Sequence, residues 1–442
     1  MTNLELVSVD NRYIEINQPE YTDEHQRLSV LLNVTREISK EIQIDRLLFT
    51  IMDEVRKALN ADRCTVFLLD EENDELWSKV AHGEREIRFP RRKGIAGYVA
   101  TTGEILNIAD AYADKRFNYE IDQKTGYRTR NMLTFPMTNK LNEIIGVFQV
   151  LNKIAGNFNQ KDEELLSAIS SISATQIENA QLYEQQRKTF NSFVETLAST
   201  IDARDQQTAG HSQRIAQYSD EVAKIINLPP ERREVLRYAS LLHDYGKVSL
   251  SDEILKNNRR LTEEQYNQMR SHPAITRNIL EKIYLPKNLR DLPKIAGSHH
   301  EKVDGSGYPQ GLTQKEIPFE ARLLAVVDAF DAMTSSRRYS DRIIDFEKVI
   351  HTLEIDSGSH FDSFFVEAFK KMPLNRLVEI LEYEAQDLLS PLDVAFLSDF
   401  NINDLLFAMR KSPFERGMIQ QKVVDKFKKY YQRRHLRKEN ND

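Results

Sequence analysis

The sequence predicts a multidomain protein with an α+β module first, one long linker helix next, and an all-helical domain after it. A chain of 442 residues exceeds an ordinary single domain, so we expect two or three domains. Strand-like stretches separated by turns occur only before about residue 160. Residues 161–203 contain no proline or glycine, and beyond Asp205 the pattern is helical to about residue 375. Together, these observations predict the fold class and the order of its parts.

The first module is predicted from the spacing of its apolar residues. Residues 1–24 are polar and are expected to form a flexible N-terminal segment. Apolar residues recur at helical spacing over 25–60. Short apolar runs at 64–69, 76–80 and 145–150 are typical of strands. A helix, several strands and a further helix indicate an α+β sensory module.

The linker helix over 161–203 is rich in Glu, Gln, Ala and Leu, which favour a helix by propensity. Its apolar residues follow an interrupted spacing of three and four. One interpretation is a parallel two-helix coil that joins two subunits into a homodimer. The alternative is a helix packed on its own domain.

Composition narrows the class of protein. Hydrophobic residues make up 40% and charged residues 29%, as in folded globular proteins. The formal charge of -7 gives no reason to expect nucleic-acid binding. The single cysteine, Cys64, cannot form an internal disulfide and fits a reducing compartment. No apolar run approaches the ~20 residues of a membrane span, and no signal peptide is recognisable. We therefore predict a cytoplasmic protein.

Five of the ten histidines fall within residues 211–300, in a pattern that predicts one metal centre. They are His211, His243, His272, His299 and His300. Asp244 directly follows the second of them, and Asp328 lies past the last. Imidazole and carboxylate bind Mn, Fe and related divalent ions. Scattered surface or core histidines are the alternative, which the accompanying aspartates disfavour.

Four ordered motifs carry a resemblance to a known family. They are LLHDYGKVSL (241–250), SHP (271–273), HHEKVDGSGYP (299–309) and VVDAFDAMTSSRRYS (326–340). They resemble the HD-GYP family, a branch of the all-helical HD-domain phosphohydrolases that hydrolyses the second messenger cyclic di-GMP. The resemblance covers roughly residues 190–375 and implies an HD-GYP domain at 186–375, followed by a helical extension at 376–442.

The resemblance also implies the metal ligands. They are the residues His211, His243, Asp244, His272, His299, His300 and Asp328, with Asp244 bridging two ions. Fe and Mn are the expected metals. Two ions about 3.5–4 Å apart would activate a water and clamp the phosphate oxygens. A zinc protease site needs only three protein ligands, and a structural zinc site favours cysteines.

The same resemblance assigns substrate contacts. Lys247 follows Asp244 by three residues, so on a helix it projects from nearly the same face and can contact the scissile phosphate. Asp244 and Lys247 are therefore the predicted catalytic residues. Gly307, Tyr308 and Pro309 are expected to line the substrate side of the pocket. Arg337 matches a family arginine that holds substrate phosphate.

Three positions refine this expectation. Asp331 lies one helical turn after Asp328 and could orient ligands or pair with Lys247. Some family members hold a third metal through a glutamate at the position of Gln207, so two metals are predicted here. Ser340 stands where a basic residue is common, a loss for which Arg338 or Arg342 could compensate.

Residues 25–185 resemble a GAF domain, a small-molecule sensor with an antiparallel sheet flanked by helices. The segments RKGIAGYVATTGEILNIADAY (92–112) and IGVFQVLNK (145–153) resemble cyclic-nucleotide-binding GAF domains of phosphodiesterases and adenylyl cyclases. The signature of those domains is met by Asn152, Lys153, Phe158, Asp162 and Glu163. A lysine and an aspartate at this spacing can form a structural pair.

The resemblance places the sensor's ligand contacts at seven positions. They are Thr65, Ile95, Ala96, Asp122, Thr125, Thr129 and Gln149. His82 occupies the place of an aspartate that can read guanine, which favours cAMP over cGMP. The alternative is a GAF domain that serves only as a dimer scaffold.

The predicted function is metal-dependent hydrolysis of cyclic di-GMP to pGpG, and to GMP if cleavage continues, under control of a small molecule in the GAF domain. One alternative is a catalytically silent receptor for cyclic di-GMP. Another is a hydrolase of a related cyclic dinucleotide such as cyclic GMP-AMP. The basic C-terminal stretch at 422–438 is interpreted as a solvated helix face, with a partner, membrane or nucleic-acid contact as the alternative.

Overall fold

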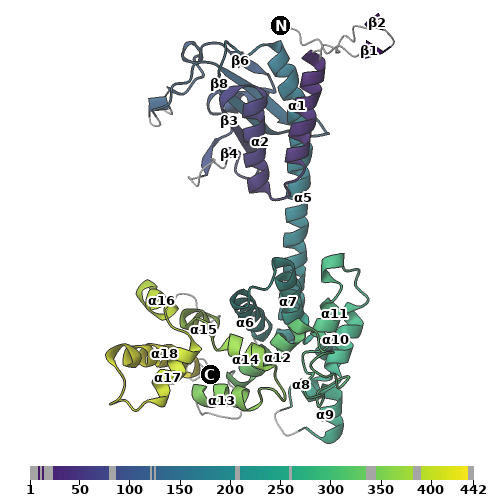
Figure 1. Ribbon diagram of the computed structural model, residues 1–442, viewed down its shortest axis with the longest axis vertical. Helices are drawn as coiled ribbons and strands as arrows, with labels where there is room; N and C mark the ends of the chain where they lie inside the picture. The colour runs from purple at the N-terminus through teal and green to yellow at the C-terminus, as the bar shows by residue number, and fades with distance from the viewer. Residues whose placement is uncertain are drawn as a thin grey trace. The chain divides into compact units, whose positions relative to one another are not determined.

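The computed structural model describes the chain from residue 23 to residue 436 with seven internal gaps, and the two short strands that precede it (Figure 1). The gaps are 79–85, 120–121, 124–125, 205–209, 258–260, 335–344 and 382–389. The predicted flexible segment 1–24 lies outside the described residues except for β1 (Ser8–Val9), β2 (Arg12–Tyr13) and the first residues of α1. The chain divides into two compact units, which we call the N-terminal unit (Met1–Thr189) and the C-terminal unit (Phe190–Asp442).

The N-terminal unit is built on a six-stranded antiparallel sheet of order β5-β4-β3-β8-β7-β6 (Figure 1). The strands are β3 (Ala61–Asp70), β4 (Glu75–Ser78), β5 (Ile87–Pro90), β6 (Leu106–Ile108), β7 (Met132–Thr138) and β8 (Ile144–Lys153). The helices are α1 (Asp23–Ile38), α2 (Ile44–Ala58), α3 (Gly94–Thr102), the 3-10 helix η1 (Ala111–Ala113) and the first part of α5 (Gln160–Arg204).

Alternating side chains give the sheet two different faces. Val66 and Phe148 point to one face, where they pack with buried residues of α1, α2 and α5. Phe67 and Val147 point to the other face, where they pack with Ala96 of α3. Because a strand alternates its side chains, this split is what the sequence of β3 and β8 requires.

The predicted antiparallel α+β fold is confirmed, and its details differ from the expected elements in two ways. The helical stretch expected over 25–60 is two helices, separated at residues 39–43. The expected strands correspond to β3, β4 and β8, whereas β5, β6 and β7 were not predicted. Strand β7 (MLTFPMT) is buried on both faces and contains Pro136, so it shows neither alternation nor the usual strand composition.

The C-terminal unit is all-helical, as predicted (Figure 1). Its elements after α5 are α6 (His211–Ile225), α7 (Pro230–Leu242), η2 (Tyr245–Ser249), α8 (Asp252–Leu255), α9 (Glu263–Met269), α10 (His272–Leu280), η3 (Lys287–Leu289), α11 (Leu292–Ala296), α12 (Phe319–Thr334), α13 (Phe346–Ile355), α14 (Ser363–Phe369), α15 (Leu374–Leu381), α16 (Pro391–Ser398), α17 (Ile402–Arg410) and α18 (Met418–Leu436). The long helix predicted over 161–203 is observed as α5.

The C-terminal helices share one core with the helices that carry the candidate site. Phe427 and Tyr431 of α18 pack on Phe346 of α13, with ring centroids 4.8 and 5.7 Å apart from it. Val423, Val424 and Tyr430 are buried in the same cluster as Tyr218 and Phe330. The interpretation of this stretch as a solvated face is therefore wrong for its apolar residues. The described lysines at 422, 428 and 429 remain exposed.

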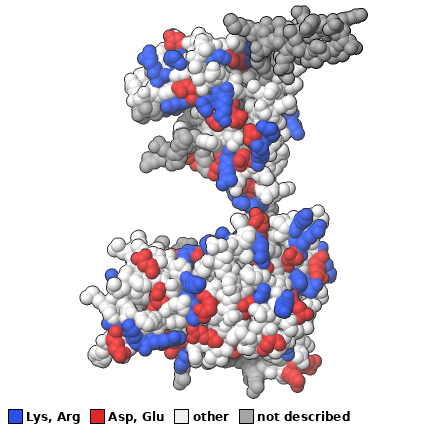
Figure 2. All heavy atoms as spheres, in the orientation of Figure 1, with Lys and Arg blue, Asp and Glu red and all other residues white. Residues whose placement is uncertain are grey.

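The described surface mixes charges of both signs. Lysines and arginines are interspersed with aspartates and glutamates over the face of each unit that Figure 2 shows. No helix in the described part of the chain is both long enough and apolar enough to cross a bilayer.

Candidate metal centre

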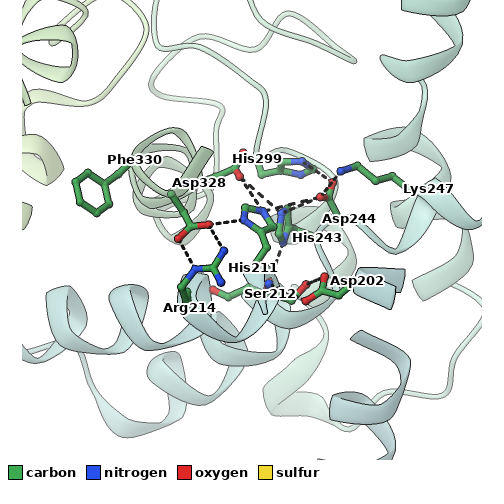
Figure 3. A network of polar contacts seen from close by, with 12 residues as sticks. Asp202, His211, Ser212, Arg214, His243, Asp244, Lys247, His299, Asp328 and Phe330 are labelled. Atoms are coloured by element: carbon green, nitrogen blue, oxygen red, sulfur yellow. Dashed lines mark hydrogen bonds and ion pairs between the residues drawn. The ribbon is translucent and has the colours of Figure 1, made fainter. Parts of the chain in front are cut away.

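The seven predicted ligands meet in the C-terminal unit, six of them at or just beyond the ends of helices and Asp328 within one. His211 is the first residue of α6, His243 and Asp244 directly follow α7, and His272 is the first residue of α10. His299 and His300 follow α11, and Asp328 lies on α12. Figure 3 shows His211, His243, Asp244 and His299 pointing toward one another. Five separate stretches of the chain therefore contribute candidate metal ligands to one site.

The approach of η2 to α10 brings the His243–Asp244 pair close to His272. The hydroxyl of Thr276 donates to the carbonyl of His243 at 2.9 Å and accepts from the backbone N–H of Gly246 at 2.8 Å. A Cβ at Gly246 would lie 2.1 Å from the carbonyl oxygen of His272. Only glycine permits this approach, so Gly246 fixes the spacing between the two ligand segments.

Hydrogen bonds on the far side of each ring determine which nitrogen faces the centre. The Nδ1 atoms of His243, His272 and His299 lie 2.7–2.8 Å from the carbonyl oxygens of Ser240, Met269 and Ala296, each three residues earlier. A carbonyl only accepts, so each Nδ1 carries the proton. Each Nε2 therefore presents a lone pair, as a metal ligand must.

The candidate ligand atoms form three overlapping groups. One group is His211, His243 and Asp328, a second is His272, His299 and His300, and the third joins His243 and His299 through Asp244. Asp244 Oδ1 lies 3.1 Å from His272 Nε2 and 3.9 Å from His299 Nε2. Asp244 Oδ2 lies 3.5 Å from His243 Nε2 and 4.0 Å from His211 Nε2. Each carboxylate oxygen thus faces a different group.

Two features of this arrangement are unfavourable without a bound cation. The Nε2 atoms of His272 and His299 lie 3.2 Å apart, although both carry lone pairs. His243 Nε2 is fully buried and has no hydrogen-bond partner among the described residues. Lone pairs that face each other in a buried space repel unless a proton or a metal ion lies between them. The donor set and its geometry therefore fit divalent metal ions, and the chain contains His/Asp groups able to bind them.

A buried ion-pair network supports the first group from behind. Asp331 is fully buried and accepts from Arg214 at 2.7 and 2.9 Å and from His211 Nδ1 at 2.8 Å. Burial raises the pKa of Asp331, but the hydrogen bonds from Arg214 and His211 outweigh burial and hold it well below its usual range. Asp331 therefore contacts His211, a candidate ligand, as the first of its two predicted roles requires.

Burial and charge keep Asp244, His299 and His300 in the protonation states that metal binding needs, whereas His211 holds a proton. Burial raises the pKa of Asp244, but Lys247 and the neighbouring histidines outweigh it and keep the carboxylate ionised. Burial lowers the pKa of His300 to about 4 and holds that of His299 well below its usual range. Burial also lowers the pKa of His211, but Asp328 and Asp331 reverse this and raise it to about 10. A metal ion at its Nε2 would replace that proton.

The predicted substrate residues border the second histidine group. Lys247 lies on the 3-10 helix η2, not on an α-helix, and its Nζ still reaches Asp244 at 2.8 Å (Figure 3). The ring of Tyr308 lies 4.8 Å from that of His300. Pro309 is exposed and follows a cis peptide bond. Arg337, Arg338, Ser340, Arg342 and Gln207 lie outside the described residues.

The loop that carries Tyr308 is held by Glu301, which sequence reasoning missed. Its buried carboxylate accepts from the backbone N–H groups of Gln310 at 2.7 Å and Leu312 at 2.9 Å. Gly307 passes so close that a Cβ there would lie 2.3 Å from the backbone nitrogen of Lys302. These contacts make the loop a defined wall of the site.

Arg214 and Arg270 were also missed. Arg214 follows His211 by three residues on α6, a spacing that places both on one helix face and could have indicated their shared contact with Asp331. Arg270 precedes His272 by two residues, and no local pattern distinguishes it from a surface arginine.

In the N-terminal unit, the predicted ligand positions lie on the α3 side of the sheet. Thr65 pairs with Gln149 across β3 and β8, and Gln149 pairs with the buried Thr134 across β8 and β7. Cross-strand partners share a face, so these three side chains form a polar row. Ile95 and Ala96 are buried at the start of α3, in apolar clusters on that same side. Thr125 and His82 lie outside the described residues.

Asp122 and Thr129 contact each other. The carboxylate of Asp122 accepts from the Thr129 backbone N–H at 2.7 Å, from its hydroxyl at 2.9 Å and from Tyr112 at 3.1 Å. The predicted structural pair of Lys153 and Asp162 is present as a half-buried ion pair. These groups are therefore already satisfied within the fold.

Comparisons with known proteins agree with both units. Residues 43–177 match the family model of the GAF domain, and residues 195–364 match that of the HD domain. A 3'3'-cGAMP-specific phosphodiesterase from Vibrio cholerae is 34% identical over 47% of this chain and 39% of its own length. A cyclic di-GMP phosphodiesterase from Thermotoga maritima is 35% identical over 40% of this chain and 48% of its own length. A probable 3',5'-cyclic phosphodiesterase from Caenorhabditis elegans is 36% identical over 36% of this chain and 24% of its own length.

The chain therefore contains a GAF domain followed by an HD domain. The names of its bacterial relatives agree with the HD-GYP resemblance of its motifs. The chain spans less than half the length of these relatives.

Proposed function

We propose that the C-terminal unit is a phosphodiesterase that uses two divalent ions, Fe or Mn, to hydrolyse cyclic di-GMP to pGpG, with GMP as the product of a second cleavage. The observation that carries the proposal is the placement of Asp244, whose Oδ1 faces His272 and whose Oδ2 faces His243, each a member of a different ligand group. One carboxylate between two ligand sets is the arrangement that bridges a pair of ions. The names of the bacterial relatives support the substrate.

The chain's own residues perform the remaining tasks. Bound divalent ions supply a water of lowered pKa and neutralise phosphate charge. Lys247 holds its ammonium 2.8 Å from Asp244, at the edge of this group, where it contacts a phosphate oxygen as negative charge develops. The Nδ1 hydrogen bonds of His243, His272 and His299 keep these rings oriented through the reaction. The loop at 301–312 closes the substrate side.

The test is chromatography of the products from cyclic di-GMP, with metal analysis of the same protein. Wild-type protein reconstituted with Mn or Fe(II) is expected to contain two ions per chain and to release pGpG. Asp244→Ala should lose both metal and turnover, because the variant lacks the shared ligand. Arg277→Ala, which removes an arginine paired with Glu281 on α10, is the matched control and should retain both. Metal-loaded protein that binds cyclic di-GMP without product would favour the catalytically silent receptor.

Cyclic GMP-AMP is the second candidate substrate, because a relative from Vibrio cholerae is named for it. Both substrates carry two phosphodiesters, and the metal centre does not distinguish them by its chemistry. Parallel digests of the two compounds at equal concentration measure the preference. A higher kcat/KM for cyclic GMP-AMP would replace cyclic di-GMP in the proposal.

We further propose that the GAF domain binds a cyclic nucleotide, with cAMP favoured over cGMP, and thereby regulates the C-terminal unit. Support comes from the polar row of Thr65, Thr134 and Gln149 between apolar clusters, which suits the polar edge of a purine ligand. Turnover of cyclic di-GMP is expected to change in saturating cAMP. Equal rates with and without cAMP and cGMP would contradict regulation and favour a dimer scaffold.

A homodimer through α5 is proposed from exposed apolar residues on that helix. Leu182 and Phe193 are each 58% exposed. They are eleven residues apart, about three helical turns, so they lie on one face. Leu182→Glu with Phe193→Glu should convert a dimer into a monomer in light scattering. A wild-type monomer would contradict the proposal. The domain limits at 25–185, 186–375 and 376–442 and the cytoplasmic location stay predictions.

A further inference from the structure

Arg270 and Tyr308 form a cation–aromatic contact beside the second histidine group. Arg270 directly follows α9 and stands two residues before His272. Its guanidinium carbon lies 4.5 Å from the centroid of the Tyr308 ring. The centroid of that ring lies 4.8 Å from that of His300. Tyr308 therefore contacts both Arg270 and a predicted metal ligand.

Arg270 differs from the other cations near the site because no carboxylate neutralises it within the described residues. Lys247 is paired with Asp244, Arg214 with Asp331, and Arg277 with Glu281. For Arg270, the described contacts are with two aromatic rings, Tyr308 and Tyr266. An arginine remains charged at any physiological pH. Its positive charge is therefore available to a bound anion.

The Arg270 guanidinium stands over the Tyr308 ring, and among the described residues its N–H groups make no hydrogen bond, so these donors are open to a ligand. Arg270 is half-buried, so its chain is held while part of it reaches solvent. Tyr266, one helical turn earlier, is 53% exposed and adds a second aromatic surface next to it. A planar fork of donors matches two oxygens of a phosphate.

A cyclic dinucleotide carries two phosphodiesters, and the proposed metal centre with Lys247 accounts for one of them. The second phosphodiester is also an anion and has to be held near the mouth of the site. Arg270 is the described cation that stands beside the site without a counterion. A charged phosphate gains more from such a cation than a neutral base does.

We propose that Arg270 binds the phosphodiester that is not being cleaved and so selects cyclic dinucleotides over substrates with a single phosphodiester. This inference rests on the proposed hydrolase function. Tyr308, which the sequence assigned to the substrate, acts here as the support for the guanidinium. Because Arg270 covers one face of the Tyr308 ring, that face does not stack on a base.

The experiment compares Arg270→Ala with wild type on substrates with one and two phosphodiesters. Cyclic di-GMP and cyclic di-AMP carry two, whereas bis(p-nitrophenyl) phosphate carries only the one to be cleaved. Loss of a bidentate contact to a charged group should lower kcat/KM for both cyclic dinucleotides about 10- to 100-fold, mainly through KM. The rate on bis(p-nitrophenyl) phosphate should stay within about twofold. Arg270→Lys should recover part of the loss, and Arg277→Ala should change neither substrate class.

Each other outcome overturns the inference. Unchanged kcat/KM for cyclic dinucleotides would mean that Arg270 does not contact them. An equal loss on bis(p-nitrophenyl) phosphate would make Arg270 a support for the Tyr308 loop. A loss on cyclic di-GMP without a loss on cyclic di-AMP would assign it to guanine.

Failure of the proposed function is recognised separately. In that case, metal-loaded wild type would cleave none of the three compounds. The affinity of wild type and Arg270→Ala for cyclic di-GMP, measured by calorimetry, would still test Arg270. Equal affinities would then overturn the inference on its own.

Discussion

In the C-terminal unit, the imidazoles and carboxylates of the metal centre face one another, whereas in the N-terminal unit most polar groups near the predicted ligand site pair with one another. His243 Nε2 is buried without a partner, and the Nε2 atoms of His272 and His299 lie 3.2 Å apart. By contrast, the carboxylate of Asp122 accepts three hydrogen bonds, and Lys153 pairs with Asp162. A metal site is thus a set of groups that the fold alone leaves unsatisfied, while a polar core is one that the fold satisfies.

The stability of the two units can be followed by separate spectroscopic signals. The chain has one tryptophan, Trp77, on β4. Its fluorescence therefore reports on the N-terminal unit alone. Far-UV circular dichroism reports on the helices of both units. The two signals together assign an effect to one unit or the other.

The largest expected effect is in the network behind the metal centre. Asp331→Ala removes the carboxylate that holds Arg214 and His211 in a buried space. Breaking a buried ion pair from one side costs about 3–5 kcal/mol, because the remaining charge stays desolvated. Urea unfolding followed by circular dichroism should show this loss, with the Trp77 transition unchanged. Arg214→Met combined with Asp331→Leu removes both charges and should recover much of the stability.

The same network predicts a pH dependence. The pKa of Asp331 is lowered in the folded state, so its contribution to stability is present above its unfolded value of about 3.9. That contribution is lost as the pH falls below this value. Asp331→Asn should flatten the acid limb of the stability curve of the C-terminal unit. An acid limb as steep as that of wild type would contradict the assignment.

The second-largest loss of stability is expected on metal removal. Ions that bind only the folded state stabilise it by about 2.7 kcal/mol at a concentration 100 times the Kd. Treatment with a chelator should therefore lower the midpoint of the helical transition of the C-terminal unit. Trp77 fluorescence should report the same transition before and after. A parallel shift of both signals would contradict the placement of the ions in the C-terminal unit.

The sequence could predict a site residue where its role depends on its residue type or on contacts close in the sequence. It could not predict one whose role depends on contacts with distant residues. The seven metal-ligand candidates carry their chemistry in their residue types, and three of the rings are oriented by carbonyls three residues away, so local motifs were sufficient. The supports of the site were not predictable in this way. Asp331 and Arg214 are 117 positions apart, and Arg270 meets Tyr308 only through the tertiary fold.

The fold shows the same limit. Strand β3 alternates and was predicted, whereas β7 is buried on both faces and was not. In the GAF domain, the residue types at the predicted contacts are common hydrogen-bonding side chains. Asp122 could equally well bind a ligand or cap its own loop, and the structure places it against Thr129. Residue type alone could not separate these two roles.

A smaller effect is expected for the ion pair of the N-terminal unit. Lys153→Met leaves Asp162 without its ammonium partner, but the carboxylate still accepts from the backbone N–H of Asn159 at 2.9 Å. The expected loss is about 1–2 kcal/mol, measured by Trp77 fluorescence in urea. Lys57→Met, at an exposed lysine of α2, is the matched control and should leave the transition unchanged. A loss of stability seen by circular dichroism but not by Trp77 fluorescence would contradict a stabilising role of this ion pair in the N-terminal unit.

The smallest effect on stability is expected at Thr134, and it tests whether the GAF domain has an unsatisfied site of its own. Among the described residues, its buried hydroxyl has one hydrogen-bond partner, the sulfur of Met132 at 3.9 Å. Thr134→Val should therefore change stability by less than about 1 kcal/mol. Thr129→Val is the control, because it removes a good hydrogen bond to Asp122 and should destabilise the unit more. If Thr134 faces a cyclic nucleotide, Thr134→Val should weaken cAMP binding in calorimetry while stability is kept. Equal binding by both proteins would mean that the Thr134 hydroxyl does not contact the nucleotide.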